Sequence, residues 1–166
     1  SNYHTEPAGR GTNGDEGLVR IGVVCHESLH FFGLPDLYDT TYMTGGLGDF
    51  CVMAGGEWNG EDGKRPSHPS VWCKYKLGLI NCRTAVEGRI NSIGESAKDF
   101  NAFYIFKPSS FNDKEYFLME NRQSVGFDKD LPGSKRGILI YHVDERQEGN
   151  DLIYNDNYLV QLEEAY

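Results

Sequence analysis

Two histidines that flank a glutamate are the residues of this sequence best suited to chemistry. They lie in the string HESLH at residues 26–30. On an α-helix, residues four positions apart project from the same face one turn apart, so the imidazoles of His26 and His30 can bind one zinc ion together. Glu27 is offset from these ligands, and its carboxylate can reach a water on the metal and accept a proton from it. The spacing therefore predicts a hydrolytic zinc site with Glu27 as the general base.

A catalytic zinc ion takes three protein ligands and keeps one position for water, so a third ligand is needed. Gly33 allows the chain to reverse after His30, and Asp36 follows three residues later with a carboxylate that can return to the metal. The string HESLHFFGLPD matches the extended zincin pattern HExxHxxGxxH, with Asp in the last place. Glu120 is an alternative third ligand, but its strand-like apolar surroundings make Asp36 the better candidate.

The ligands need a helix and then a turn, and the neighbouring sequence predicts both. Acidic residues at positions 15 and 16 precede apolar residues at helical spacing, and Gly33 and Pro35 end the pattern, which indicates a helix over residues 17–32. Residues 34–66 are rich in Gly, Asp, Thr and Asn and predict a long ordered loop of the kind that is usually functional. A second helix is expected over residues 69–77.

Short apolar and aromatic segments follow the second helix and are separated by turn-like residues. They predict strands at residues 103–106, 115–120, 137–143 and 158–162. The expected fold class is therefore α+β, with an active-site helix, a long loop, a second helix and a mostly antiparallel strand region.

Composition limits the classes of protein to which the chain can belong. Its 166 residues, 39% of them hydrophobic, fit a single globular domain over residues 1–166. A net charge of -9 argues against nucleic acid as a partner, because a phosphate backbone needs a basic surface. No apolar run is long enough to cross a bilayer, so we expect no transmembrane segment.

The four cysteines, an even number, permit disulfides with three different pairings. They are Cys25, Cys51, Cys73 and Cys82. Proximity in the sequence makes Cys73–Cys82 the first expectation, and four free thiols carry about equal weight.

Motifs on both sides of the second predicted helix resemble the immune inhibitor A family of secreted metallopeptidases. The resemblance rests on five strings in the order of that family: GLPDLYD at 33–39, VMAGG at 52–56 with Trp58, WCKYKLG at 72–78, ENRQ at 120–123 and GILIYHVDE at 137–145. It identifies Met53 with the methionine that metzincins hold in a tight turn beneath the zinc site.

This resemblance implies a secreted zinc endopeptidase that acts on proteins or peptides. Its implied ligands are His26, His30 and Asp36, and its implied catalytic base is Glu27. It also implies structural calcium. The candidate calcium ligands are Asp39, Asp49, Asp62 and the cluster Asn155-Asp156-Asn157. The donor to the oxyanion stays open between Tyr38, Tyr42 and His142, although a plain hydrogen-bonded strand role is favoured for His142.

The chain also departs from that family. Family members have a substantial N-terminal sheet before the active-site helix, whereas only about twenty residues precede it here, so we expect this sheet to be missing and the chain to be part of a longer protein with which it associates. The alternative hypothesis is an inactive or truncated zincin domain that serves as a structural or interaction module in a larger extracellular assembly. The intact Glu27 argues against that alternative, because metal binding alone does not require it. A zinc hydrolase with a non-peptide substrate is the weakest option.

Overall fold

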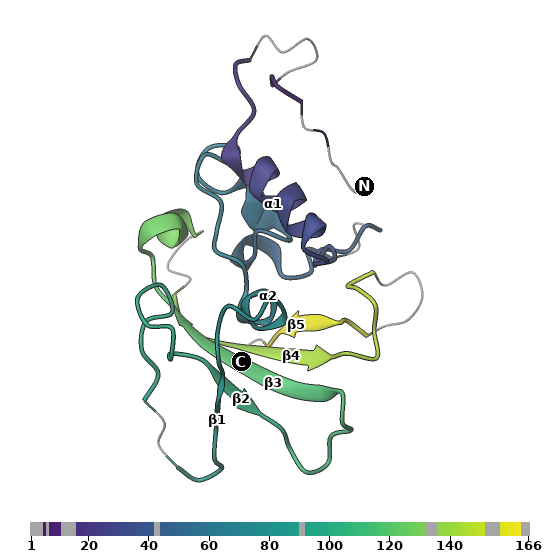
Figure 1. The fold of residues 1–166 in the computed structure, drawn as a ribbon, viewed down its shortest axis with the longest axis vertical. Coiled ribbons are helices and arrows are strands. Elements are labelled where there is room, and N and C mark those ends of the chain that lie inside the picture. The colour runs from purple at the N-terminus through teal and green to yellow at the C-terminus, as the bar shows by residue number, and fades with distance from the viewer. Residues whose placement is uncertain are drawn as a thin grey trace.

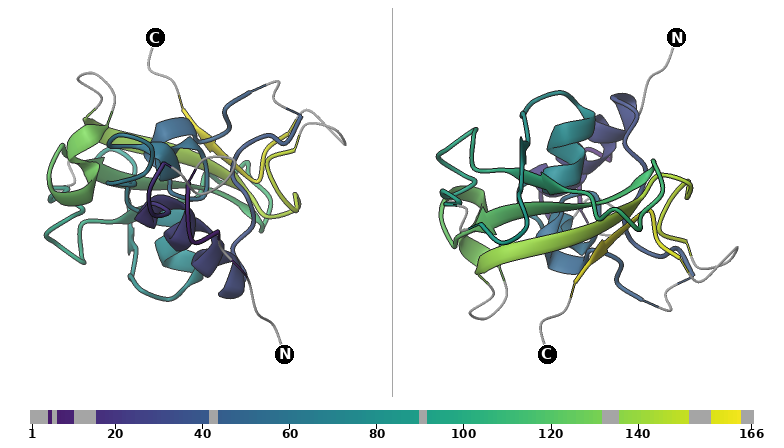
Figure 2. Two further views of the ribbon diagram at one scale, coloured as in Figure 1. Left: turned by 90° about the horizontal axis from the view of Figure 1, so that it is seen from above. Right: turned by 90° about the horizontal axis from the view of Figure 1, so that it is seen from below.

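Two helices and a long loop lie on one side of a five-stranded sheet (Figures 1 and 2). This computed structural model describes residues 5, 7–10, 16–41, 44–89, 92–131, 136–151 and 157–163. The predicted α+β class is confirmed. None of the helices in these ranges is long and apolar enough to cross a lipid bilayer.

The first helix, α1 (Ile21–Phe31), carries the histidines of the HESLH string. It begins later than predicted, because Leu18 pairs with Gly9 in an isolated antiparallel bridge and Arg20 is still extended, with φ -84° and ψ 152°. It ends as predicted: Gly33 adopts a φ of +90°, which favours glycine, and its N–H donates to the carbonyl of His30 at 2.8 Å. The chain therefore turns back directly after the second histidine.

A close backbone approach holds α1 against the loop that follows it. The 3-10 helix η2 (Gly55–Trp58) lies beside Gly22, and a Cβ atom added at Gly22 would lie 1.9 Å from the carbonyl oxygen of Glu57. Since no side chain fits there, glycine at this position brings the helix and the loop into the contact on which the metal centre depends.

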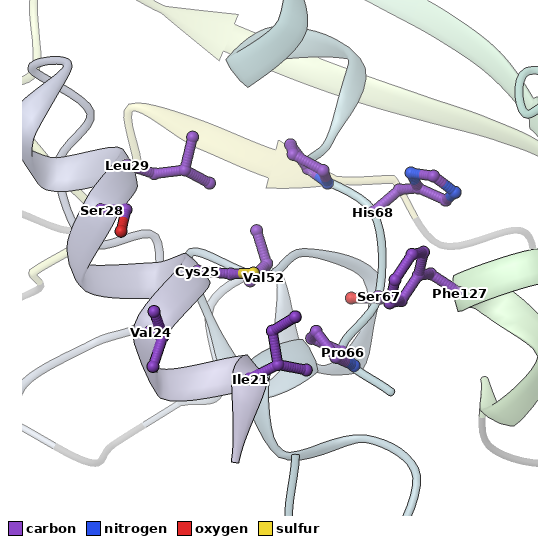
Figure 3. A pocket seen from close by; sticks show the side chains of 11 residues that line it. Ile21, Val24, Cys25, Ser28, Leu29, Val52, Pro66, Ser67, His68 and Phe127 are labelled. Carbon is purple, nitrogen blue, oxygen red and sulfur yellow. The ribbon is translucent and has the colours of Figure 1, made fainter. Parts of the chain in front are cut away.

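The apolar stripe of α1 lines a groove (Figure 3). The groove has a volume of about 390 Å³, and Val52, residues 66–69 and Phe127 form its other wall. Its α1 wall consists of Ile21, Val24, Cys25, Ser28 and Leu29. The buried residues of α1 are instead Gly22 and His26. The helix thus buries a histidine, whereas its apolar stripe is only partly covered, with Cys25 and Leu29 packed against the core.

The second helix and the strands form the rest of the fold. Ser70 caps the start of helix α2 (Val71–Lys76), because its side chain accepts a hydrogen bond from the N–H of Cys73. The sheet has the order β1-β2-β3-β4-β5; β1 is parallel to β2, and the other neighbours are antiparallel. The strands are β1 (Arg83–Thr84), β2 (Tyr104–Phe106), β3 (Glu115–Arg122), β4 (Gly137–Asp144) and β5 (Val160–Leu162). Two more 3-10 helices are η1 (Gly48–Phe50) and η3 (Gly126–Asp130).

A charged network lies under α2 on the buried face of β3. Glu120 is 0% exposed and accepts hydrogen bonds from the N–H of Val71, the hydroxyl of Tyr141 and the guanidinium of Arg122. The ammonium of Lys74 lies 3.3 Å from its other oxygen. Burial opposes ionisation of Glu120, but the charges of Arg122 and Lys74 and these hydrogen bonds lower its pKa from 4.5 to about 2. The carboxylate is therefore ionised in the folded protein over the whole neutral and mildly acidic range.

The depressed pKa of Glu120 predicts a specific acid sensitivity. Its contribution to stability is fully present above the unfolded-state pKa near 4.5 and is lost as the pH falls from there towards about 2. A shift of this size corresponds to roughly 3 kcal/mol. Urea unfolding between pH 6 and 2 should therefore show a steeper loss of stability for the native chain than for Glu120→Gln. Asp113→Asn, which alters a fully exposed carboxylate, is the control and should keep the native slope. Equal slopes for the native chain and Glu120→Gln would contradict the prediction.

Candidate metal centre

Three potential ligand atoms of the predicted zinc site converge at one point. Nε2 of His26 lies 3.1 Å from Nε2 of His30, and one carboxylate oxygen of Asp36 lies 2.9 Å and 3.2 Å from the two nitrogens. The histidines come from successive turns of α1, and the reversal at Gly33 returns Asp36 to them. Among the residues that the structure describes, these three form the group that could hold a metal ion.

The backbone fixes the orientation of both imidazoles. Nδ1 of His26 lies 2.8 Å from the carbonyl oxygen of Val52, and Nδ1 of His30 lies 2.7 Å from that of Leu34. A carbonyl oxygen can only accept, so each Nδ1 carries a proton, and in the neutral imidazole Nε2 is the nitrogen that can bind a metal ion. Histidine ligands of metals are typically held by such an outer hydrogen bond, which sets both the tautomer and the ring angle.

The surroundings of His26 favour positive charge. Burial by itself would lower the pKa of His26, but the hydrogen bond with Asp36, the carbonyl of Val52 and the negative charge of Glu57 raise it to about 9. Burial likewise opposes ionisation of Asp36, yet its hydrogen bond with His26, the positive charges of the two histidines and a hydrogen bond with Tyr38 lower its pKa. The electrostatics that select a cation at this point also suit a divalent metal ion.

Two glutamates lie near His26, one next to it on α1 and one in η2. Glu27 follows His26 on α1 and is partly buried. Glu57, in η2, lies 3.5 Å from Nδ1 of His26, the ring nitrogen that faces away from the other ligands. Burial and the negative charge of Glu27 raise the pKa of Glu57, although the charge of His26 opposes them. Glu57 is therefore suited to orient the ring of His26. It lies beside Nδ1 and not beside Nε2, so we do not assign it to the metal-binding side of the ring.

A cleft of about 420 Å³ opens beside the ligands. His30, Pro35 and Asp36 line one side, and residues 147–151 with Asn157 line the other. Asn150 is 1% exposed and binds the carbonyl oxygens of Leu37 and Val160. The segment after β4 is thereby fastened to the chain immediately after Asp36, and the C-terminal part of the chain forms one wall of the cleft.

The structure separates other predicted candidates from the centre. Glu120 lies in the charged network on β3, so it is not brought to the histidines. His142 on β4 binds Glu115 through Nε2 at 3.0 Å and packs against Phe117, in agreement with a plain strand role. Tyr38 lies near the site, with its ring centroid 6.2 Å from that of His26. Tyr42 lies outside the described residues.

The structure gives the predicted calcium no support. Asp39 is 1% exposed and accepts hydrogen bonds from the backbone and side chain of Thr41, while Asp62 pairs with Arg10. In the described ranges, Asp39, Asp49 and Asp62 do not come together as a group of metal ligands. Residues 155 and 156 of the third candidate lie outside those ranges.

Three parts of the centre were not predicted from the sequence. The carbonyl groups of Val52 and Leu34 carry no signal in a residue type, since every residue has one. Glu57 could have been suspected, because it is a carboxylate between Gly56 and Trp58 within the string that carries the family resemblance.

Two imidazoles and a carboxylate around one point, with a glutamate on the same helix and an open cleft beside them, are typical of metal-dependent hydrolases. Residues 14–78 match the family model of the immune inhibitor A peptidase M6 catalytic domain. The predicted resemblance is confirmed over this segment, which contains both α-helices and the three candidate ligands, and it indicates a metallopeptidase. No curated protein and no solved structure matches the chain.

Proposed function

We propose that the chain carries the active site of a secreted zinc-dependent endopeptidase. The observation that carries the proposal is the convergence of His26 Nε2, His30 Nε2 and an Asp36 oxygen within 3.2 Å of one another. Lone pairs that face one another at such distances repel unless a cation or a proton lies between them. The family match to a peptidase catalytic domain supports the peptide bond as the substrate.

Zinc suits this set of atoms better than calcium or magnesium, because two of the three are imidazole nitrogens. Tetrahedral bonds of about 2.0–2.1 Å place neighbouring ligand atoms about 3.3 Å apart. The observed separations of 2.9, 3.1 and 3.2 Å are close to that value. Three protein ligands leave one position for water or substrate, which is the coordination of catalytic zinc and not of structural zinc.

The residues of the chain have separable roles in peptide hydrolysis. When bound, the zinc ion supplies a Lewis acid that polarises the peptide carbonyl and lowers the pKa of water. Glu27 accepts the proton of the attacking water and transfers it to the nitrogen of the departing amine. Tyr38, whose ring centroid lies 6.2 Å from that of His26, is the described candidate for the donor to the developing oxyanion. Its hydroxyl donates to Asp36, so it would have to turn from that carboxylate to the oxyanion.

The proposal includes two further features: a methionine turn beneath the zinc ion, as in metzincins, and an extracellular location. Met53 is 0% exposed, and its carbonyl accepts the N–H of Leu37 at 2.7 Å. Through this hydrogen bond the methionine turn contacts the residue that follows Asp36, which supports the assignment of Met53 to the turn beneath the zinc ion. The extracellular location rests on the likeness to a family of secreted peptidases and agrees with the acidic net charge of -9.

Zinc binding tests the ligand assignment directly. The native chain, dialysed with zinc and then against buffer, should hold about one zinc ion per chain by elemental mass spectrometry. His30→Ala should lower the affinity more than about 100-fold, since loss of a mere outer-sphere partner already lowers it 10–100-fold. His142→Ala is a matched control, because the two imidazoles are similarly exposed, at 31% and 29%. Equal zinc loss in both variants, or none in either, would refute the assignment.

A further inference from the structure

Two cysteines from different elements meet in the protein core. Cys51 precedes the turn that carries Met53, and Cys73 lies in α2. Both are 0% exposed, and their sulfur atoms lie 3.7 Å apart. This pair differs from the expected pairing of Cys73 with Cys82, because the packing of α2 against the loop outweighs proximity along the chain.

Polar hydrogens surround the sulfur of Cys51. The N–H groups of Met53 and Ser70 donate to it at 3.4 Å and 3.3 Å, and the hydroxyl of Ser70 donates to the sulfur of Cys73 at 3.3 Å. Burial opposes a thiolate at Cys51, but the hydrogen bond with Cys73 and those from the two N–H groups lower its pKa. Burial and the neighbouring Cys51 raise the pKa of Cys73. In the folded core, Cys51 is thus the more acidic thiol of the pair.

We propose that Cys51 and Cys73 form a disulfide when the chain folds under oxidising conditions. The sulfur atoms must approach from 3.7 Å to about 2.05 Å, a movement that small rotations of two side chains can share. Because both thiols are buried in the folded protein, the bond forms while the core is still open.

The oxidant is a small-molecule disulfide such as oxidised glutathione. Either cysteine can attack first in the open core; where it is Cys51, its thiolate attacks one of the sulfur atoms of the oxidant, which breaks the small disulfide and releases the first thiolate. The Cys73 thiolate then attacks the sulfur of Cys51, breaks the mixed disulfide and releases the second. Two cysteines are oxidised, one small disulfide is reduced to two thiols, and the two cysteine protons end on those thiols.

The disulfide would stabilise the loop whose backbone carbonyl groups hydrogen-bond to the metal-binding residues and their neighbours. Val52 follows Cys51, and its carbonyl oxygen accepts the Nδ1–H of His26 at 2.8 Å. The next residue, Met53, accepts the N–H of Leu37. A disulfide from Cys51 to α2 therefore fixes the loop from which both hydrogen bonds originate. It also closes the segment between Cys51 and Cys73, which lowers the conformational entropy of the unfolded chain.

Peptide mapping of the full chain tests the pairing. The protein is refolded with reduced and oxidised glutathione, free thiols are alkylated in denaturant, and the chain is cut with trypsin and a glutamyl endopeptidase. The second protease is needed because cleavage after Glu27 separates Cys25 from Cys51, which trypsin leaves on one peptide. We expect alkylation at Cys25 and Cys82, and a linked peptide pair that contains Cys51 and Cys73 and is lighter by two hydrogen atoms than the two free peptides.

Thermal unfolding provides the second measurement. Reduction should lower the melting temperature of the oxidised chain by about 5–10 °C. Cys82→Ser is the control and should retain both the linked peptides and this shift, whereas Cys73→Ser should lose both. Four alkylated cysteines after oxidative refolding, or a linked pair that contains Cys82, would overturn the proposal. The mapping of the native chain decides this even where Cys73→Ser fails to fold.

Discussion

Glu27→Gln should lower kcat/KM for cleavage of a protein substrate such as casein by about 10²–10⁴-fold and leave zinc binding nearly unchanged. Glutamine has nearly the same shape as glutamate but cannot accept the proton of the attacking water at neutral pH. The ligand atoms belong to His26, His30 and Asp36, so this substitution removes no metal ligand. A large loss of activity with full zinc content therefore separates the general base from the metal site.

Glu57→Gln is the matched control for this experiment. Both glutamates lie near His26, but Glu57 faces Nδ1, the nitrogen bound to the carbonyl of Val52, and not the Nε2 that points to the other ligands. Its replacement should weaken zinc binding by at most about 10–100-fold, as expected for an outer-sphere partner. At saturating zinc, the Glu57→Gln variant should keep a near-native kcat.

The two variants also discriminate between the functional hypotheses. Full zinc content without proteolysis in the native chain would favour the structural or interaction module over the peptidase. Native proteolysis that survives Glu27→Gln but is lost in Glu57→Gln would assign the base to Glu57 and contradict the role given to Glu27.

The arrangement of the candidate centre followed from local rules. His26 and His30 meet because a helix repeats every 3.6 residues, and Asp36 joins them because Gly33 can adopt a positive φ. Both rules act over ten residues and need no tertiary information. The supports of the same centre come from further away, since the carbonyl of Val52 reaches His26 only after the loop has packed against Gly22.

Long-range packing also explains the errors in the predicted fold. Strand β1 consists of two exposed residues that pair with β2, so its sequence has no alternation to detect. The apolar stripe of α1 indicated a helix correctly but not which residues are buried, because these are Gly22 and His26 while Cys25 and Leu29 are only partly covered. The pairing of Cys51 with Cys73 likewise depends on where α2 docks, which spacing along the chain does not reveal.

Arg122→Met should destabilise the fold by about 3–5 kcal/mol, the effect of removing one partner from a buried ion pair. The guanidinium is 0% exposed and lies 3.1 Å from Glu120 and 2.5 Å from Asp128. Its removal leaves Asp128 without this counter-charge in the core, and Glu120 with Lys74 alone. Methionine fills much of the same volume, and the loss therefore reports charge and hydrogen bonding more than a cavity. Urea unfolding at pH 7, followed by the fluorescence of Trp72, which is 3% exposed, measures the change.

Arg146→Met is the matched control, since Arg146 also has two carboxylate partners, Asp144 and Glu115. Its side chain is 54% exposed, however, and an exposed ion pair contributes at most about 1 kcal/mol. The comparison therefore isolates burial as the cause of the difference. Similar destabilisation by the two substitutions would show that the ion pairs under α2 contribute no more to stability than a solvent-exposed ion pair does.

A second substitution can test whether the lost counter-charge is the reason. In Glu120→Gln with Arg122→Met, the glutamine oxygen can still accept the hydrogen bonds from Val71 and Tyr141 without carrying a charge. The double variant should therefore be more stable than the sum of the two single effects predicts, with a coupling of about 1–3 kcal/mol. Strict additivity would mean that Arg122 acts on Asp128 and on the carbonyl of His68, to which it also donates, and not through the charge of Glu120. The network fastens β3 to the start of α2, the helix that holds Cys73, so its stability bears on the loop behind the metal centre as well.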